Sequence, residues 1–448
     1  MDILLSNELN ALYENRVANL DKQQLMPEHI DAIIDDFATR DGVTKIIIGQ
    51  SFCGLPISCL SMGNGPKKVL LWTQMHGDES TATAAVLDMI QLFTAKLSTS
   101  LNTNWHSLLT IHIVPMLNPD GAAAGTRENA QGIDINRDAL ALQTPEGRAL
   151  NAIVEKIQPD FAFNLHDQND YFRCGAHGKS STLAFLAPAF DAQKTINPAR
   201  RKAMVLAALM QVHANALLPA GIARYDDEFS ARSFGDQIAG RGISTILIES
   251  GHYPNDQYRQ VARTMNVSVL LHALNMLCEQ LHWTTDEKLK ELEIKYWQIP
   301  ENQENKLCDL LIKDLGFAGN SYTTDIAIRK QSRFSPLTLV ADIGDLHQQY
   351  GLNTFQGLGY TYDPGQSYLL SEELYLTNES YIELLKKGYS HFVGNINLIE
   401  NHSDYIVIEN PKYWHDDKKM MKGVTPAGFL CKEGERIFAF VMGEILSL

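Results

Sequence analysis

The feature that most constrains the fold is a series of short, continuous apolar runs that alternate with longer stretches of helical spacing. Three of these runs are 69–73, 161–165 and 244–248. A run without polar alternation is typical of a central strand that is buried on both faces. Helical stretches such as 82–97 and 198–218 lie between the runs. This alternation predicts an α/β fold, with a mixed, mostly parallel sheet flanked by helices.

The character of the sequence changes near position 283. The segment 284–306 is charged and irregular and contains Pro300, so we interpret it as a linker or transition. Beyond it, helical patterns become rare and short strand-like runs, such as 405–408, are separated by Gly, Asp, Asn and Pro. The sequence therefore predicts two domains, a larger α/β domain at 1–283 and a smaller β-rich C-terminal domain at 284–448 whose role it does not indicate.

Charge and composition exclude several classes of protein. The chain has 38 Lys and Arg against 53 Asp and Glu, a net charge of −15, which argues against a nucleic-acid partner. Its six cysteines form no CxxC pair, so a disulfide framework or a cysteine-based zinc site is not expected. No apolar run is long enough to span a bilayer, and the start of the chain lacks a secretory pattern. We therefore expect a cytoplasmic protein without a membrane partner.

The first motif with chemical meaning is HGDE at 76–79, which follows an apolar run and precedes a helical stretch. His76 and Glu79 are three residues apart, a spacing at which side chains converge when a turn continues into a helix. Imidazole and carboxylate groups suit zinc, and a catalytic zinc site needs a third protein ligand. The candidate is His166, which directly follows the run 161–165. The alternative is a chance HxxE in a chain with many histidines and acids.

A second motif block, residues 118–138, also follows an apolar run. It contains NPDG at 118–121, Arg127, and the pair Asn136 and Arg137. A guanidinium group presents a planar fork of donors that matches a carboxylate, so these residues can form a carboxylate clamp. The alternatives are ion pairs in surface loops for the arginines and a simple turn for NPDG.

A third signal is Glu249, which ends the apolar run 244–248. A carboxylate at the rim of a buried sheet is costly unless it faces water, a metal or a partner, and it can serve as a general base. The alternative is a solvated end of a strand. His76, Asn118, His166 and Glu249 all lie at or just beyond the C-terminal ends of expected strands, and this edge of an open α/β sheet is where ligands bind.

Taken in order from about Gly49 to Gly251, these motifs resemble the zinc carboxypeptidases of the carboxypeptidase A type. The family's fold is a mixed eight-stranded sheet between helices, which agrees with the expected order of elements. The resemblance does not extend to 284–448. The motifs that carry it are IGQS at 48–51, GLPI at 54–57, HGDE at 76–79, NPDG at 118–121, the Arg127 segment, GIDINRD at 132–138, NLHD at 164–167 and ILIESG at 246–251.

The resemblance implies the chemistry of the central residues. It implies one Zn²⁺ ion, held by His76, Glu79 and His166. Arg127 is similar to the residue that steadies the oxyanion, and Glu249 is similar to the general base and acid.

The resemblance also implies how a substrate is held. Asn136 and Arg137 look like the clamp for its terminal carboxylate, and Asp236 looks like a structural aspartate of the family. Tyr225 is the nearest counterpart of the tyrosine that covers the substrate, although its spacing differs. Independently, we expect Asp167 to orient a metal ligand, because a ligating histidine usually donates its other N–H to an acceptor.

The sequence therefore predicts a zinc metallocarboxypeptidase that hydrolyses a C-terminal peptide or amide bond with a metal-activated water and Glu249 as base. The expected partner is a peptide or amino-acid conjugate with a free carboxylate. Two alternatives stay open, a zinc amidohydrolase of the desuccinylase or deacylase type and a non-catalytic peptide-binding homologue. Side-chain specificity and oligomeric state are not indicated.

Overall fold

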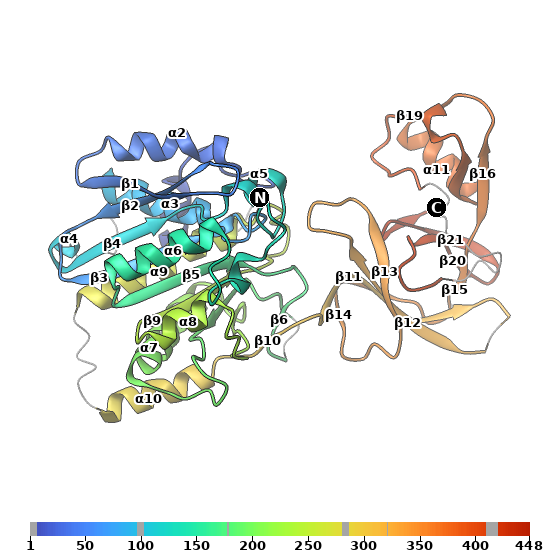
Figure 1. The fold of residues 1–448 in the computed structure, drawn as a ribbon. Coiled ribbons are helices and arrows are strands. Elements are labelled where there is room, and N and C mark those ends of the chain that lie inside the picture. The colour runs from blue at the N-terminus through green and yellow to red at the C-terminus, as the bar shows by residue number, and fades with distance from the viewer. Residues whose placement is uncertain (1–6, 96–102, 177–178, 280–285, 320, 409–419) are drawn as a thin grey trace. The chain divides into compact units, whose positions relative to one another are not determined.

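The computed structural model divides the chain into two compact units, Met1–Glu304 and Asn305–Leu448 (Figure 1). We describe each unit by itself. The structure describes residues 7–95, 103–176, 179–279, 286–319, 321–408 and 420–448.

Within the described residues, the first unit is built on an eight-stranded sheet with the order β1-β2-β4-β3-β5-β9-β7-β8. The four strands β4, β3, β5 and β9 are parallel, and antiparallel pairing occurs between β1 and β2, β2 and β4, and β7 and β9. The mixed sheet predicted from the apolar runs is confirmed. Its strands are β1 (Val43–Gln50), β2 (Pro56–Met62), β3 (Lys67–Thr73), β4 (Leu109–Val114), β5 (Phe161–Asp167), β7 (Leu183–Leu186), β8 (Ile222–Arg224) and β9 (Ser244–Ser250).

Helices cover both faces of this sheet and create two cores (Figure 1). Adjacent side chains of β3 belong to different cores, with Leu71 in the core under α3, α7 and α9 and Trp72 in the core under α6 and α8. Burial on both faces explains the continuous apolar runs. The helices of this unit are α1 (Asn7–Glu14), α2 (Pro27–Ala38), α3 (Thr81–Thr94), α4 (Trp105–Leu108), α5 (Pro119–Ala124), α6 (Pro145–Ile157), α7 (Pro198–Leu217), α8 (Phe234–Gly240), α9 (Gln260–Cys278) and α10 (Asp286–Trp297).

The segment that the sequence presents as a linker differs from that expectation, because it contains α10. Tyr296 of α10 is fully buried, and its hydroxyl oxygen accepts a hydrogen bond from the amide of Ala187 at 3.0 Å. The chain then forms β10 (Asn302–Gln303), which pairs with β6 (Arg173–Cys174). The compact unit that includes these contacts runs to Glu304, whereas the sequence suggests a boundary at 283/284. The charged surface of α10 obscures its apolar face in the sequence.

The second unit is rich in strands, as predicted. Among its described residues, a sheet with the order β13-β12-β11-β15-β20-β21-β22 has β14 beside β11. Two short parallel pairs, β16 with β18 and β17 with β19, lie near the helix α11 (Asn378–Lys386). Its strands are β11 (Leu307–Phe317), β12 (Thr323–Lys330), β13 (Thr338–Gly344), β14 (Tyr350–Gln356), β15 (Thr361–Asp363), β16 (Gln366–Leu370), β17 (Leu374–Leu376), β18 (Tyr389–Gly394), β19 (Ile399–Asn401), β20 (Ala427–Lys432), β21 (Glu435–Val441) and β22 (Glu444–Ser447).

One strand prediction in this unit is wrong, because residues 405–408 are irregular. Their apolar side chains pack into the core around α11, and three of their backbone carbonyls accept hydrogen bonds. The carbonyl of Tyr405 accepts one from the side-chain amide of Asn401 at 2.9 Å. The hydroxyl of Tyr381 donates to the carbonyl of Ile406 at 2.9 Å, and the amide of Phe392 donates to that of Ile408 at 2.9 Å. Burial without strand pairing therefore produced the apolar pattern. In the part of the chain that the structure describes, no helix has the length and apolarity that a bilayer crossing requires.

Candidate active site

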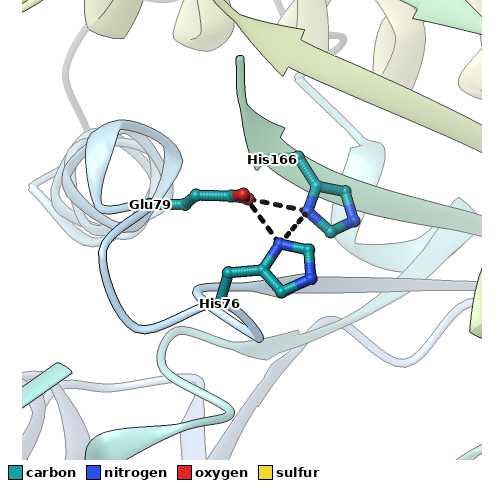
Figure 2. Close-up of side chains that lie close together, drawn as sticks. All are labelled: His76, Glu79 and His166. Atoms are coloured by element: carbon teal, nitrogen blue, oxygen red, sulfur yellow. Dashed lines mark hydrogen bonds and ion pairs between the residues drawn. The ribbon is translucent and has the colours of Figure 1, made fainter. Parts of the chain in front are cut away.

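Three side chains from distant parts of the sequence converge at one edge of the first sheet (Figure 2). His76 and Glu79 lie in the turn from β3 to α3, and His166 lies near the end of β5. Because β3 and β5 are parallel neighbours, their C-terminal ends meet at the same edge. The Nδ1 atom of His76 lies 2.7 Å from Glu79 Oε1, and Nδ1 of His166 lies 2.8 Å from Glu79 Oε2. The three predicted ligands are thus brought together.

The turn that carries the first two ligands is held by the NPDG motif. The side chain of Asn118 accepts a hydrogen bond from the amide of Gly121 at 2.9 Å and donates one to the carbonyl of Met75 at 3.3 Å. Gly77 packs so closely on the backbone of Gly121 that an added Cβ would lie 2.0 Å from its carbonyl carbon. The motif is therefore a turn, as the simpler interpretation holds, and it also fixes the loop that carries His76.

The orientation of His76 is set by Asp134, a residue for which we predicted no role of its own. Nε2 of His76 lies 3.1 Å from Asp134 Oδ1, which leaves Nδ1 directed at Glu79 and His166. We expected Asp167 to orient the adjacent ligand His166, and its carboxylate accepts a hydrogen bond from the Thr81 hydroxyl at 2.6 Å. Asp134 lies inside the GIDINRD motif. The motif therefore pointed to this residue, but it did not indicate that Asp134 contacts His76.

The donor set and its spacing fit a zinc ion. The Nδ1 atoms of His76 and His166 are 3.2 Å apart, close to the edge of about 3.3 Å that a tetrahedron with ligand distances of about 2.0–2.1 Å has. Two imidazole lone pairs at this distance repel each other unless a proton or a cation lies between them. Among the described residues, His76, Glu79 and His166 form the one group of at least three His, Cys, Asp or Glu side chains close enough to hold a metal, and all three are buried.

The charges within this cluster shift the pKa values of its side chains strongly. Burial by itself lowers the pKa of His76, but the carboxylates of Glu79 and Asp134 raise it to about 9. Burial opposes ionisation of Glu79, but the two histidines hold the pKa of its carboxyl well below the usual range. Burial lowers the pKa of His166. Cation and anion therefore stabilise each other in a site from which water is largely excluded.

Glu249 lies directly beside this cluster. In the parallel pairing of β5 and β9, it is the partner of His166. Its side chain is buried, and its Oε2 atom has no hydrogen-bond partner among the described residues. Burial, with the nearby charge of Glu79, raises the pKa of the Glu249 carboxyl well above its usual value. A buried, unpaired carboxyl oxygen next to a metal-ligand cluster favours a chemical role over the alternative of a solvated strand end.

Arg127 contacts the same cluster from its open side. Its guanidinium donates to Glu79 Oε1 and to Asp134 Oδ2, both at 3.1 Å. The side chain is 41% exposed, so a bound molecule could reach it. Arg127 is thus not a remote surface ion pair but part of the site.

The residues that the sequence predicts to clamp and cover a substrate lie around this centre. The backbone amide of Asn136 donates to Asp134 Oδ1 at 2.8 Å, which ties it to the residue that orients His76. Nη1 of Arg137 donates to the Asn136 carbonyl at 2.7 Å and to the Ser233 hydroxyl at 3.1 Å. Tyr225 follows β8, and burial together with the charges of nearby carboxylates, Glu249 foremost, raises the pKa of its hydroxyl.

Asp236, which we expected to be structural, lies in α8. Its Oδ1 atom accepts a hydrogen bond from the amide of Ser230 at 2.9 Å. Burial raises the pKa of its carboxyl to about 6. The contact holds the segment that leads into α8.

Comparison with known proteins points to one family. The family model of the zinc carboxypeptidases matches residues 30–164. An uncharacterized protein of Zymomonas mobilis is 29% identical over 145 residues, which is 32% of this chain and 38% of that protein. Murein peptide amidase A of Escherichia coli K12 is 26% identical over 177 residues, 33% of this chain and 66% of that protein. The chain thus spans less than two thirds of the length of either relative.

Among solved structures, a metallo-carboxypeptidase from Burkholderia cenocepacia has a TM-score of 0.46 and 17% identity, covering 56% of this chain and 70% of that one. The family match includes the motifs around His76, Arg127 and Arg137 and ends two residues before His166, which the structure places beside His76 and Glu79. Residues 30–164 of the first unit are therefore similar in sequence to the zinc carboxypeptidases.

Proposed function

We propose that the first unit is a zinc-dependent hydrolase that cleaves the peptide bond preceding a C-terminal residue. The observation that carries this proposal is the convergence of His76, Glu79 and His166, with the buried carboxyl of Glu249 beside them. His76 Nδ1, His166 Nδ1 and the Glu79 carboxylate would hold one zinc ion. When bound, the ion supplies Lewis acidity and makes hydroxide available near neutral pH.

Glu249 supports the proton transfers of such a reaction. Its unpaired Oε2 atom can accept a proton from an attacking water and return it to the departing amine. The burial of the carboxyl removes competing water, and its place opposite His166 on the neighbouring strand directs it to the cluster. We therefore assign Glu249 as the general base and acid.

Arg127 supports stabilisation of the developing oxyanion. Its guanidinium already faces Glu79 and Asp134, and its partial exposure leaves it accessible to a substrate oxygen. A fixed cation aimed at developing negative charge is usually the largest electrostatic contribution to acyl transfer. Its two carboxylate partners hold the guanidinium in place before a substrate arrives.

Asn136 and Arg137 support recognition of a free carboxylate. Asn136 is tied to Asp134, and Arg137 is an exposed arginine anchored by the Asn136 carbonyl and Ser233. A carboxylate bound here would place the last peptide bond, rather than an internal one, at the metal. Tyr225, beside the catalytic carboxyls, is our candidate for the side chain that covers the substrate. The partner would be a peptide or amino-acid conjugate with a free carboxylate.

A second candidate is hydrolysis of an amide bond within a cell-wall peptide, because the chain is similar to murein peptide amidase A. The zinc ligands and Glu249 would serve both reactions. The two candidates differ in how strictly they require a free carboxylate on the residue that follows the cleaved bond.

The experiment measures zinc content and hydrolysis of three substrates by the purified full chain. These are a blocked dipeptide with a free carboxylate, the same dipeptide as its C-terminal amide, and a murein peptide. We expect one zinc per chain and preference for the free carboxylate. Preference for the murein peptide would favour the second candidate. Zinc without turnover of any substrate would favour a binding protein, and absence of zinc would refute the proposal. His76→Ala is the metal-free control.

A further inference from the structure

Behind the candidate metal site lies a buried arginine, Arg259, whose guanidinium joins two strand ends. Its side chain is 3% exposed. Nη1 donates to the carbonyl of Ser250 at 2.7 Å, and Nη2 donates to the carbonyl of Gln168 at 2.5 Å. Nη2 also donates to Asp170 Oδ1 at 2.6 Å. A single cation therefore contacts both chain segments as they leave the sheet.

These two segments carry key residues of the site. Ser250 directly follows Glu249, and Gln168 lies two positions after His166. The amide of Gln168 also donates to the Ser250 carbonyl at 2.9 Å, so this oxygen accepts two hydrogen bonds. Arg259 thus extends the pairing of β5 and β9 past their last residues. The distance between a metal ligand and the general base depends on this pairing.

A third segment of the site is connected through Asp167. Its Oδ2 atom lies 3.6 Å from Arg259 Nη1 and accepts a hydrogen bond from the Thr81 hydroxyl at 2.6 Å. Thr81 begins α3, two residues after Glu79. The amide of Asp167 donates to Glu79 Oε2 at 3.1 Å. The network therefore reaches all three segments that carry the ligands and the base.

The backbone of Arg259 is itself constrained. It is in the left-handed region, with φ of 53°, immediately before α9. This conformation costs free energy in a residue other than glycine, and it persists where surrounding contacts determine it. Here it turns the guanidinium back toward the strand ends.

One helical turn further on, Arg263 provides a matched comparison. It is as buried as Arg259, and its guanidinium forms two hydrogen bonds of 2.7 Å to Asp88 in α3. It also donates to the carbonyl of Val17 at 2.9 Å. Arg263 therefore ties helices and the N-terminal segment together, and these hydrogen bonds do not involve the strand ends at the site.

We propose that Arg259 is a positioning residue that holds His166, Glu249 and the turn carrying Glu79 in the arrangement that binds the metal. This inference rests on the proposed function, because the site must hold zinc for the arrangement to matter. Lysine cannot replace Arg259 fully, since an ammonium group does not contact several oxygens through a planar fork.

The test compares Arg259→Gln, Arg259→Lys and Arg263→Gln with the wild-type full chain. We measure zinc affinity by competition with a chelator, the visible spectrum of the cobalt-substituted protein, kcat and KM, and thermal unfolding. For Arg259→Gln we expect zinc affinity to fall by about 10- to 100-fold, with a changed cobalt spectrum and a lower kcat at nearly constant KM. Arg259→Lys should be intermediate. Arg263→Gln should lose thermal stability but retain zinc affinity and spectrum.

The inference is overturned if Arg259→Gln keeps the zinc affinity and cobalt spectrum of the wild type, or if Arg263→Gln weakens zinc binding equally. If Arg259→Gln does not fold, Arg259→Lys decides, and a folded lysine variant with unchanged affinity and spectrum overturns the inference. A wild-type chain that binds no zinc refutes the proposed function and this inference together. A wild-type chain that binds zinc and is catalytically active, with unaffected Arg259 variants, refutes this inference alone.

Discussion

The two units of this chain use sheets of similar size but bury different kinds of side chain. In the first unit, the buried side chains include charged groups such as Glu79, Asp88, Glu249, Arg259 and Arg263. In the described part of the second unit, the buried polar side chains are Thr338, Ser390 and His391. Burying a charge is costly unless it is paired or bound to a metal. In the first unit Arg263 pairs with Asp88 and Arg259 with Asp170, whereas one carboxyl oxygen of Glu249 has no partner among the described residues.

Strand direction explains where these groups gather. In the first unit β3, β5 and β9 are adjacent and parallel, so the residues that follow them meet at one edge. In the second unit most neighbouring strands are antiparallel, as are β20, β21 and β22. Successive strand ends then point to opposite edges, and polar residues at these ends are separated. The comparison teaches that the direction of neighbouring strands, rather than the size of the sheet, brings reactive side chains together at one edge.

The largest expected effect tests the chemical side of this comparison. Glu249→Gln removes the proposed base while keeping its shape, and a neutral amide suits a site where burial raises the pKa of the carboxyl. We expect kcat to fall by about 10²- to 10⁴-fold with zinc content unchanged. Steady-state kinetics and metal analysis of the same preparation check this. Retention of full activity would remove Glu249 from the mechanism.

The next effect tests the independence of the second unit. Phe440 is fully buried there, and Phe440→Ala should destabilise that unit by about 3–5 kcal/mol through lost contacts and a cavity. Zinc affinity and kcat should stay at wild-type values, because the ligands and base belong to the first unit. Denaturant unfolding and chelator competition measure the two quantities. Weakened zinc binding would show that the second unit supports the site and would break the comparison.

A smaller effect tests substrate recognition at the edge of the first sheet. Arg137→Gln should raise KM for a substrate with a free carboxylate by about 10- to 100-fold, because hydrogen bonds to charged groups contribute about 1.5–3 kcal/mol. Hydrolysis of the amidated substrate should change little. Arg148→Gln, an exposed arginine that contacts the carbonyls of Leu142 and Gln143, is the control. Equal losses with both substrates would exclude a carboxylate clamp.

The smallest effect tests burial away from the site. Burial lowers the pKa of His112 in β4 from 6.5 to about 4. Between these two pH values the imidazole is therefore neutral in the folded chain but largely protonated in the unfolded chain. The unfolded state then binds more protons, and the free energy of unfolding falls as the pH drops from 6.5 to 4. Because the side chain is only partly buried, we expect about 1–2 kcal/mol. His112→Gln should flatten this dependence in urea unfolding at several pH values. An unchanged slope would contradict the prediction.

Much of the first unit was predictable because its patterns are local. Continuous apolar runs identify strands that are buried on both faces, and the residues that end them carry the chemistry. On this basis the sequence predicts His76, Glu79 and His166 as metal ligands, and the structure brings them together. By contrast, α10 was missed because its many charged residues hide a narrow buried face that includes Leu292 and Tyr296.

By itself, the amino-acid sequence determined which groups could do chemistry, since imidazole, carboxylate and guanidinium at strand ends are properties of single positions. Only the tertiary structure decided which of them meet. It paired His76 with Asp134, and it placed Arg259 against both strand ends. Such contacts join positions up to 91 residues apart, so they depend on how strands pair and helices pack and leave no periodic pattern in the chain.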